Sequence, residues 1–257
     1  MKHSTSNRKK QITVTISAAI AILLIWQLLA FVFPVKFILA GPVEVVQRLF
    51  TLIQSYDFWL NFLYSTNRIV LGLLFGIIAG VLFAVLAKKN CWLHEFFQQI
   101  SLIFKSVPIA LITIILLILF SSQGITMIVV FIMSFPIIYT NYLLGLKEHD
   151  QKLLEMATVF RWSEKKKWKY IYLKAAEPYF KSGLQIASGM AWKAGVAAEI
   201  IGLPKHSVGE EIYNAKIFLQ SADIFCYAIM IVLFSVLTEK IMVRLIIALH
   251  RKWRGVT

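Results

Sequence analysis

The sequence is poor in the residues that build disulfides, metal centres and hydrolytic sites. Its 257 residues include two cysteines, five histidines and 13 acidic residues. The histidines are not paired at the spacing of metal ligands, and no cluster of carboxylates lies beside an apolar run. We therefore expect no catalytic residue and no metal site, and a membrane enzyme is a poor alternative. The histidines are His3, His94, His149, His206 and His250.

A phosphate-binding loop is also missing. The pattern Gly-x-x-x-x-Gly-Lys-Ser/Thr, which cradles the phosphates of ATP, occurs nowhere in the chain. Charge is scarce as well, since Asp, Glu, Lys and Arg make up 16% of the residues. The chain is expected to hold no ATPase site and no cofactor of its own.

Long apolar runs dominate what is present. Hydrophobic residues make up 59% of the chain and the mean hydropathy is +0.73, which is too apolar for an ordinary soluble domain. A helix needs about 20 apolar residues to cross a bilayer. The sequence predicts an all-α, polytopic membrane protein, with residues 1–257 forming a single transmembrane domain of about six spans. The predicted spans are 12–33, 62–87, 100–120, 125–146, 183–203 and 224–249.

Basic residues are placed on one side of these spans. They cluster before the first span, at Lys88 and Lys89, between 147 and 182, and after the last span. The positive-inside rule then predicts a multi-pass protein of the cell membrane with both termini in the cytoplasm. The net charge of +14 is interpreted as topology and attraction to anionic lipid, not as binding of nucleic acid. Cys91 and Cys226 would lie on opposite faces, so they are not expected to form a disulfide.

Small residues recur along two of the predicted spans. They lie four residues apart at Gly72, Gly76 and Gly80 in the second span, and at Ala191 and Gly195 in the fifth. Such stripes allow helix backbones to approach closely in lipid. We expect these helices to pack in the middle of the assembly.

Two prolines lie within the apolar runs, and a short amphipathic segment lies between the first two of them. Pro108 and Pro136 lie within the third and fourth spans and are expected to kink them. Residues 41–50 begin with Gly-Pro and carry apolar residues at helical spacing. We expect a short helix on the outer interface, with a solvated loop as the alternative.

The predicted inside loop 147–182 is longer than the connection of two helices requires. Ser163 is a good helix N-cap and Glu164 suits the first turn of the helix that follows. We expect two short helices that meet at a turn and fit a groove on a soluble partner.

Residues 150–175 resemble the cytoplasmic signature loop of binding-protein-dependent ABC importer permeases. That loop reads Glu-Ala-Ala, three residues, Gly, nine residues, then Ile, any residue, Leu and Pro. Four positions agree with this pattern, Glu155, Ala157, Ile171 and Leu173, and three depart from it, Met156, Arg161 and Lys174. Arginine resists the positive φ that glycine allows in the turn. Either the turn is redrawn, or Arg161 contacts the partner.

Further segments are similar to permeases of the nitrate, sulfonate, taurine and bicarbonate type, namely 39–42, 65–72, 105–111 and 197–202. The resemblance implies two permease copies, or one copy with a related partner, and an extracellular or periplasmic solute-binding protein. It also implies an ATPase subunit that binds ATP and Mg²⁺ and docks on the 150–175 loop. The implied contacts to that subunit are Glu155, Met156, Ala157, Arg161, Ile171 and Leu173. The cargo stays open between such anions and vitamin-like compounds, and a vitamin importer with a membrane-embedded capture protein remains an alternative.

Two ionisable residues lie within the fifth predicted span, where charge is costly. The resemblance favours Glu199 as a pathway or gate residue, with helix packing as the alternative. Lys193 is a candidate contact for an anionic cargo, with snorkelling or pairing to another helix as the alternative. Arg68 is expected to anchor at lipid headgroups. An ion-coupled secondary transporter needs several buried relay residues and often an internal repeat, whereas Glu199 stands nearly alone.

Overall fold

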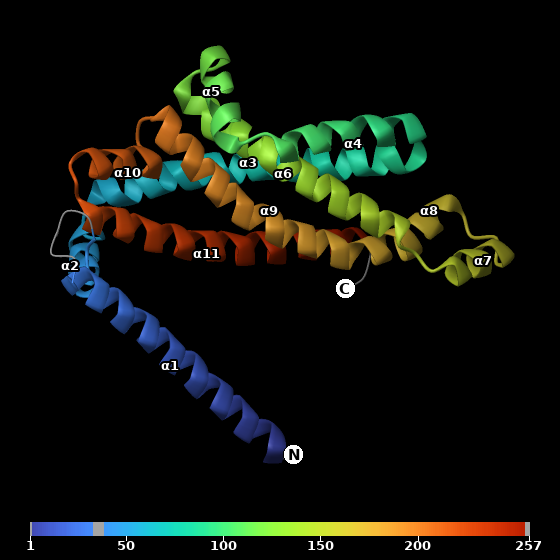
Figure 1. Ribbon diagram of the computed structural model, residues 1–257. Helices are drawn as coiled ribbons and strands as arrows, with labels where there is room; N and C mark the ends of the chain where they lie inside the picture. Colours follow the sequence, from blue (N-terminus) through green and yellow to red (C-terminus); the bar gives the residue numbers. More distant parts are fainter. Residues whose placement is uncertain (1, 33–38, 255–257) are drawn as a thin grey trace. The chain divides into compact units, whose positions relative to one another are not determined.

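The computed structural model describes residues 2–32 and 39–254, and these residues form helices without any strand (Figure 1). The predicted all-α class is confirmed. The elements are α1 (Lys2–Val32), α2 (Pro42–Leu52), α3 (Tyr56–Lys89), α4 (Cys91–Ser106), α5 (Ile109–Leu119), α6 (Ser122–Lys147), α7 (Gln151–Val159), α8 (Glu164–Lys167), the π-helical segment η1 (Trp168–Tyr172), α9 (Leu173–Gly202), α10 (Val208–Ile217) and α11 (Ser221–Arg254).

Among the described residues, four helices are long and apolar enough to cross a membrane. Together, α4 and α5 form a fifth candidate that is broken by a bend of 103°. The prediction of a polytopic membrane protein is therefore confirmed. The four continuous spans are Thr13–Val32, Tyr56–Lys89, Ser122–Lys147 and Ser221–Lys252.

The predicted third span, 100–120, is not one kinked helix. Helix α4 ends at Ser106, Val107 is extended, and Pro108 is the N-cap residue of α5. Proline has no N–H for the helix and disfavours helical geometry in the residue before it, so the chain breaks there. Pro136, in contrast, lies inside the continuous helix α6.

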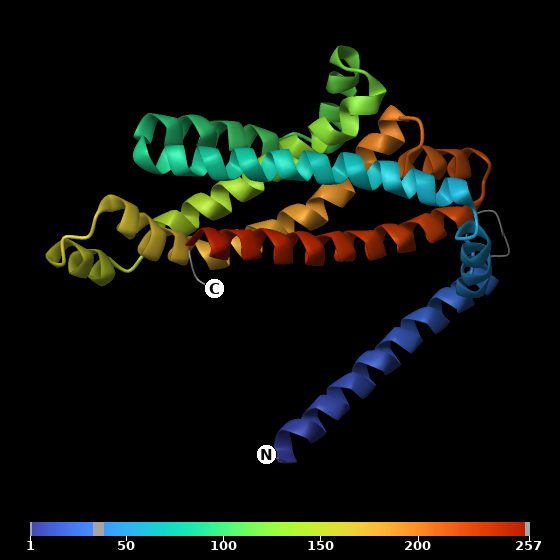
Figure 2. The ribbon, with the colours of Figure 1, turned by 180° about the vertical axis from the view of Figure 1, so that it is seen from behind.

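The predicted fifth span, 183–203, lies in α9, which is not among the helices apolar enough to cross alone. Alanine, glycine and serine replace large apolar residues along it, and Lys193 and Glu199 interrupt it. Many of these small residues are buried against α6 and α5, so α9 packs mainly on protein. Figures 1 and 2 show α9 crossing directly beside α6.

The glycine stripe of α3 faces α6. A Cβ atom added at Gly76 would lie 2.7 Å from Cβ of Ser134, and one added at Gly80 would lie 2.8 Å from Cβ of Ile138. Gly72 is crowded by the same helix. Real carbon atoms do not approach so closely, and any larger residue would push the two helices apart.

The contacts divide the chain into two units. The first contains α1, α2 and residues 211–230. Within it, the Arg48 guanidinium donates two hydrogen bonds to Asp223, of 2.5 and 2.8 Å, and thereby fixes α2 to the start of α11. The expected helix over 41–50 is confirmed as α2, with proline in its first turn.

The second unit contains residues 60–210 and the chain from 231 onward. In it, the 150–175 segment forms α7, α8, η1 and the start of α9, at one end of α6 and α9. The other end of α9, its C-terminal end, lies away from the 150–175 segment and beside the start of α10. Both candidate sites described below belong to this unit.

Candidate functional site

The 150–175 segment folds as a short helix, α7, followed by the predicted turn. The predicted second short helix is not separate, because α8 continues through η1 into α9 without a break. The Asp150 side chain caps α7 by accepting a hydrogen bond of 2.9 Å from the backbone N–H of Lys152. Ser163 holds the N-cap position of α8, although its side chain makes no capping hydrogen bond. Instead, Glu164 accepts a hydrogen bond of 2.8 Å from Lys167 across the first turn.

Arg161 adopts the conformation that the family pattern gives to glycine. Its φ is 50°, in the left-handed region. The backbone N–H of Trp162 donates to Ala157 O at 2.8 Å, and that of Arg161 donates to Thr158 O at 3.0 Å. This pair of bonds is the usual left-handed ending of a helix. The turn is therefore not redrawn, and the chain tolerates a strain of roughly 1–2 kcal/mol at this residue.

The six predicted partner contacts divide into two groups of three. Ala157, Ile171 and Leu173 are buried within this chain, so their side chains are not available to a partner in this conformation. The other three are exposed and form part of the outer surface: Glu155, Met156 and Arg161.

Helix α7 presents an apolar face that we did not single out from the sequence. Leu153, Met156, Val159 and Phe160 are all exposed, and the last two are 78% and 69% accessible. Their spacing of three to four residues places them on one side of the helix. Apolar residues at helical spacing within a polar loop were the signal that could have identified them.

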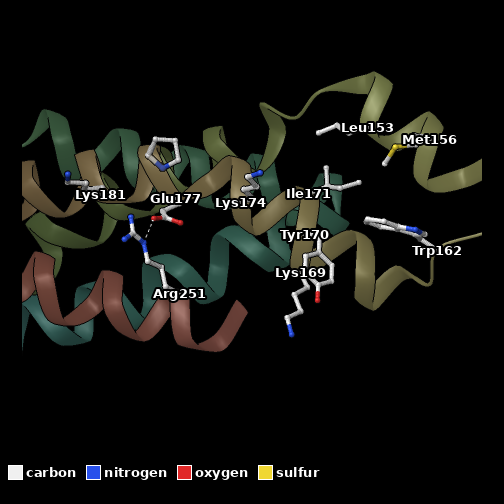
Figure 3. Close-up of a pocket in the computed structure, with 11 residues that line it drawn as sticks. Leu153, Met156, Trp162, Lys169, Tyr170, Ile171, Lys174, Glu177, Lys181 and Arg251 are labelled. Carbon is white, nitrogen blue, oxygen red and sulfur yellow. Dashed lines mark hydrogen bonds and ion pairs between the residues drawn. The ribbon is translucent and has the colours of Figure 1, made fainter. Parts of the chain in front are cut away.

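A groove of about 940 Å³ lies between this segment and the neighbouring ends of α9 and α11. Figure 3 shows Met156 and Trp162 at one end, and Lys181 and Arg251 at the other. Nε of Arg251 donates a hydrogen bond of 2.7 Å to Oε1 of Glu177. Lys174, which replaces the proline of the family pattern, also lines the groove. An acidic and partly apolar surface would complement it.

Glu199, at the far end of α9, is completely buried. Its Oε2 atom accepts a hydrogen bond of 2.7 Å from Oγ of Ser65 and one of 3.3 Å from the backbone N–H of Gly209. Its Oε1 atom lies 3.8 Å from Nη1 of Arg68. The carboxylate therefore connects α3, α9 and the first turn of α10.

Arg68 belongs to the same cluster. Its Nη2 atom donates to Oε1 of Gln123 at 2.6 Å and to the carbonyl of Lys205 at 2.9 Å. The side chain is only 13% exposed. The expectation that Arg68 anchors at headgroups was therefore wrong, because protein acceptors and the Glu199 carboxylate surround its guanidinium. We call Ser65, Arg68, Glu199 and the backbone of 208–209 the outer clamp, after the side of the membrane that the distribution of basic residues predicts for it.

The structure does not bring Lys193 to this cluster. Its side chain is exposed on α9, whereas Glu199 is buried. Six residues separate the two, which turns them by roughly 120° around the helix. No ion pair of Lys193 occurs among the described residues.

Apolar helices long enough to cross a membrane, an exposed helical segment at one end and a buried charged cluster at the other describe a polytopic membrane protein. Residues 72–255 match the family described as the inner membrane component of binding-protein-dependent transport systems, and the chain belongs to this family. It is thus a permease subunit of an ABC transporter, and the ion-coupled secondary transporter is excluded.

Several permeases are similar over much of the chain. The putative aliphatic sulfonates transport permease protein SsuC of Bacillus subtilis is 28% identical over 91% of this chain and 85% of its own length. The bicarbonate transport system permease protein CmpB of Synechocystis is 29% identical, over 81% and 78%. The nitrate import permease protein NrtB of Leptolyngbya laminosa is 30% identical, over 62% and 61%.

Proposed function

We propose that this subunit forms the translocation pathway of an importer for a small solute and is driven by a separate ATPase subunit that docks on the 150–175 segment. The observation that carries the proposal is the exposed apolar face of α7, Leu153, Met156, Val159 and Phe160. Such a face on a helix suits a groove on a partner protein. ATP and Mg²⁺ would be bound by that partner, and this chain would contribute no catalytic residue and no cofactor.

The same proposal implies two further partners. A second permease copy, identical or related, would complete the pathway, and a solute-binding protein outside the membrane would deliver the cargo. With the docking segment in the cytoplasm, both termini are cytoplasmic, as the distribution of basic residues indicates. The relatives are named for sulfonates, bicarbonate and nitrate, which are all anions. We therefore assign a small anion as cargo and Lys193 as its candidate contact.

Affinity purification of the tagged complex in mild detergent tests the docking surface. We compare the wild type with Phe160→Glu, which places a charge on the apolar face of α7. Phe218→Glu is the matched control, because Phe218 is 70% exposed but lies beyond the end of α10. Wild type and F218E should recover the ATPase subunit, and F160E should recover at least tenfold less.

Two outcomes would count against the proposal. Equal recovery by F160E and wild type would remove α7 as the docking surface. A wild-type protein that is purified without any ATPase subunit, and that carries solute in liposomes without ATP, would overturn the function itself.

A further inference from the structure

Lys88 joins three elements at the end of α3. Its Nζ atom lies 3.4 Å from the centroid of the Tyr172 ring and 5.6 Å from that of Trp168. The same ammonium donates a hydrogen bond to the carbonyl of Leu146, in the last turn of α6. The neighbouring Lys89 reaches Trp168 alone, at 5.5 Å. In the sequence, both lysines indicated only that this end of the span lies in the cytoplasm.

These contacts suit a cation. The faces of aromatic rings carry negative charge density that attracts an ammonium group. The carbonyls of the last helical turn lack partners within the helix and lie at the negative end of its dipole. Lys88 is half-buried, so water competes weakly for its ammonium group. A neutral side chain of similar length would lose both kinds of contact.

The main chain links the 150–175 segment to some helices and not to others. Elements α8, η1 and α9 follow one another without a break, and only residues 148–150 separate α6 from α7. Helices α6 and α9 also touch at Gly145, where an added Cβ would lie 2.8 Å from Cα of Ala176. Helix α3, in contrast, does not adjoin this segment along the main chain, and among the described residues Lys88 makes the shortest cation–ring contact from α3 to it.

Helix α3 also carries the outer clamp at its other end. Ser65 and Arg68 bind Glu199 there, about 30 Å from Lys88 at about 1.5 Å per residue. The helix between them is uninterrupted. The π-helical turn η1, which holds both aromatic rings, is a feature that often marks functional sites in helices.

We propose that Lys88 is a positioning residue that links α3 to the 150–175 segment. A movement that the ATPase subunit imposes on this segment then reaches the outer clamp. The inference rests on the proposed function. Movement passes to α9 through the main chain and to α3 through the contact of Lys88 with Tyr172. Loss of this contact uncouples the 150–175 segment from α3 and the outer clamp without removing the apolar face of α7.

The test uses the whole transporter in proteoliposomes, with its ATPase subunit and binding protein. Lys88→Met and Tyr172→Leu each break the contact, whereas Lys88→Arg and Tyr172→Phe keep a cation and a ring. Lys89→Met is the matched control for loss of one charge. For each variant we measure recovery of the ATPase subunit, and the stimulation of ATP hydrolysis by the binding protein in medium that contains nitrate, bicarbonate and a sulfonate.

We expect K88M and Y172L to assemble as the wild type does but to lose at least fivefold of the stimulation. K88R, Y172F and K89M should stay within twofold of wild type. Because Y172L leaves the bond between Lys88 and Leu146 intact, it serves as a second test should K88M fold poorly. If assembled K88M and Y172L are stimulated as strongly as K89M, the role of Lys88 is refuted while the proposed function stands. A wild type without an ATPase subunit refutes both.

Discussion

At the scale of single residues, Glu199 shows how a charge is held inside the protein. A buried carboxylate is costly unless its oxygens find donors and a counter-charge. Ser65 and the backbone of Gly209 donate to Oε2 at 2.7 and 3.3 Å, and Arg68 lies 3.8 Å from Oε1, which accepts no hydrogen bond among the described residues. The geometry favours the helix-packing alternative for Glu199, because all of these partners belong to the protein.

Replacing Glu199 with alanine is therefore expected to destabilise the protein. The change leaves the Arg68 guanidinium without its carboxylate and removes two hydrogen bonds, which together cost about 3 kcal/mol of the free energy of unfolding. Glu199→Gln keeps an oxygen that accepts from Ser65 and Gly209, so it should cost less. Unfolding in detergent measures both variants. An E199A protein that unfolds like wild type but carries no solute would instead make Glu199 a pathway residue.

Arg161 and Arg68 show where prediction from the sequence succeeded and where it failed. The spacing of the family motif located the turn at Arg161, but the sequence could not say that an arginine would accept a φ of 50° there. Arg68 was placed at headgroups because hydropathy reports depth along a single helix. Its acceptors, Gln123 and Lys205, come from distant parts of the chain, which a one-dimensional pattern does not bring together.

At the scale of elements, hydropathy located the helices with long apolar runs better than α9, in which small residues replace large apolar ones. Helices α3, α6 and α11 overlap predicted spans because each carries such a run, although α6 is itself largely buried. The break between α4 and α5 was expected only as a kink, since the pattern of apolar residues runs on through Pro108. Pro136, in contrast, lies inside α6, which continues past it, so the presence of proline alone does not predict a break.

Close packing of α3 on α6 predicts the effect of a single methyl group. Gly76→Ala places a Cβ within 2.7 Å of Ser134, so one of the helices must shift. We expect a loss of about 1–3 kcal/mol of stability, typical of an overpacked interior. Gly124→Ala is the control, since nothing lies within 4 Å of the added atom. Thermal unfolding of both variants in detergent measures the difference, and equal midpoints would contradict the packing.

At the scale of the whole molecule, the two candidate sites lie at opposite ends of α3. The docking face and Lys88 are at one end, and the outer clamp is at the other. Loss of the docking face should abolish assembly, loss of Lys88 should abolish coupling, and loss of a pathway residue should change transport alone. These separate outcomes make the roles distinguishable in one reconstituted system.

Substitution of Lys193 tests, in the same reconstituted system, whether the cargo is an anion. Its ammonium is exposed on α9 and has no ion-pair partner among the described residues, so an anion passing along this helix would gain a counter-charge. Lys193→Met should raise the solute concentration for half-maximal uptake of an anion roughly tenfold, the equivalent of about 1.4 kcal/mol. Lys193→Arg should keep it, and Lys216→Met, which removes an exposed lysine of α10, is the charge control. Unchanged uptake by K193M would remove this residue from the pathway and leave selection of the cargo to the binding protein.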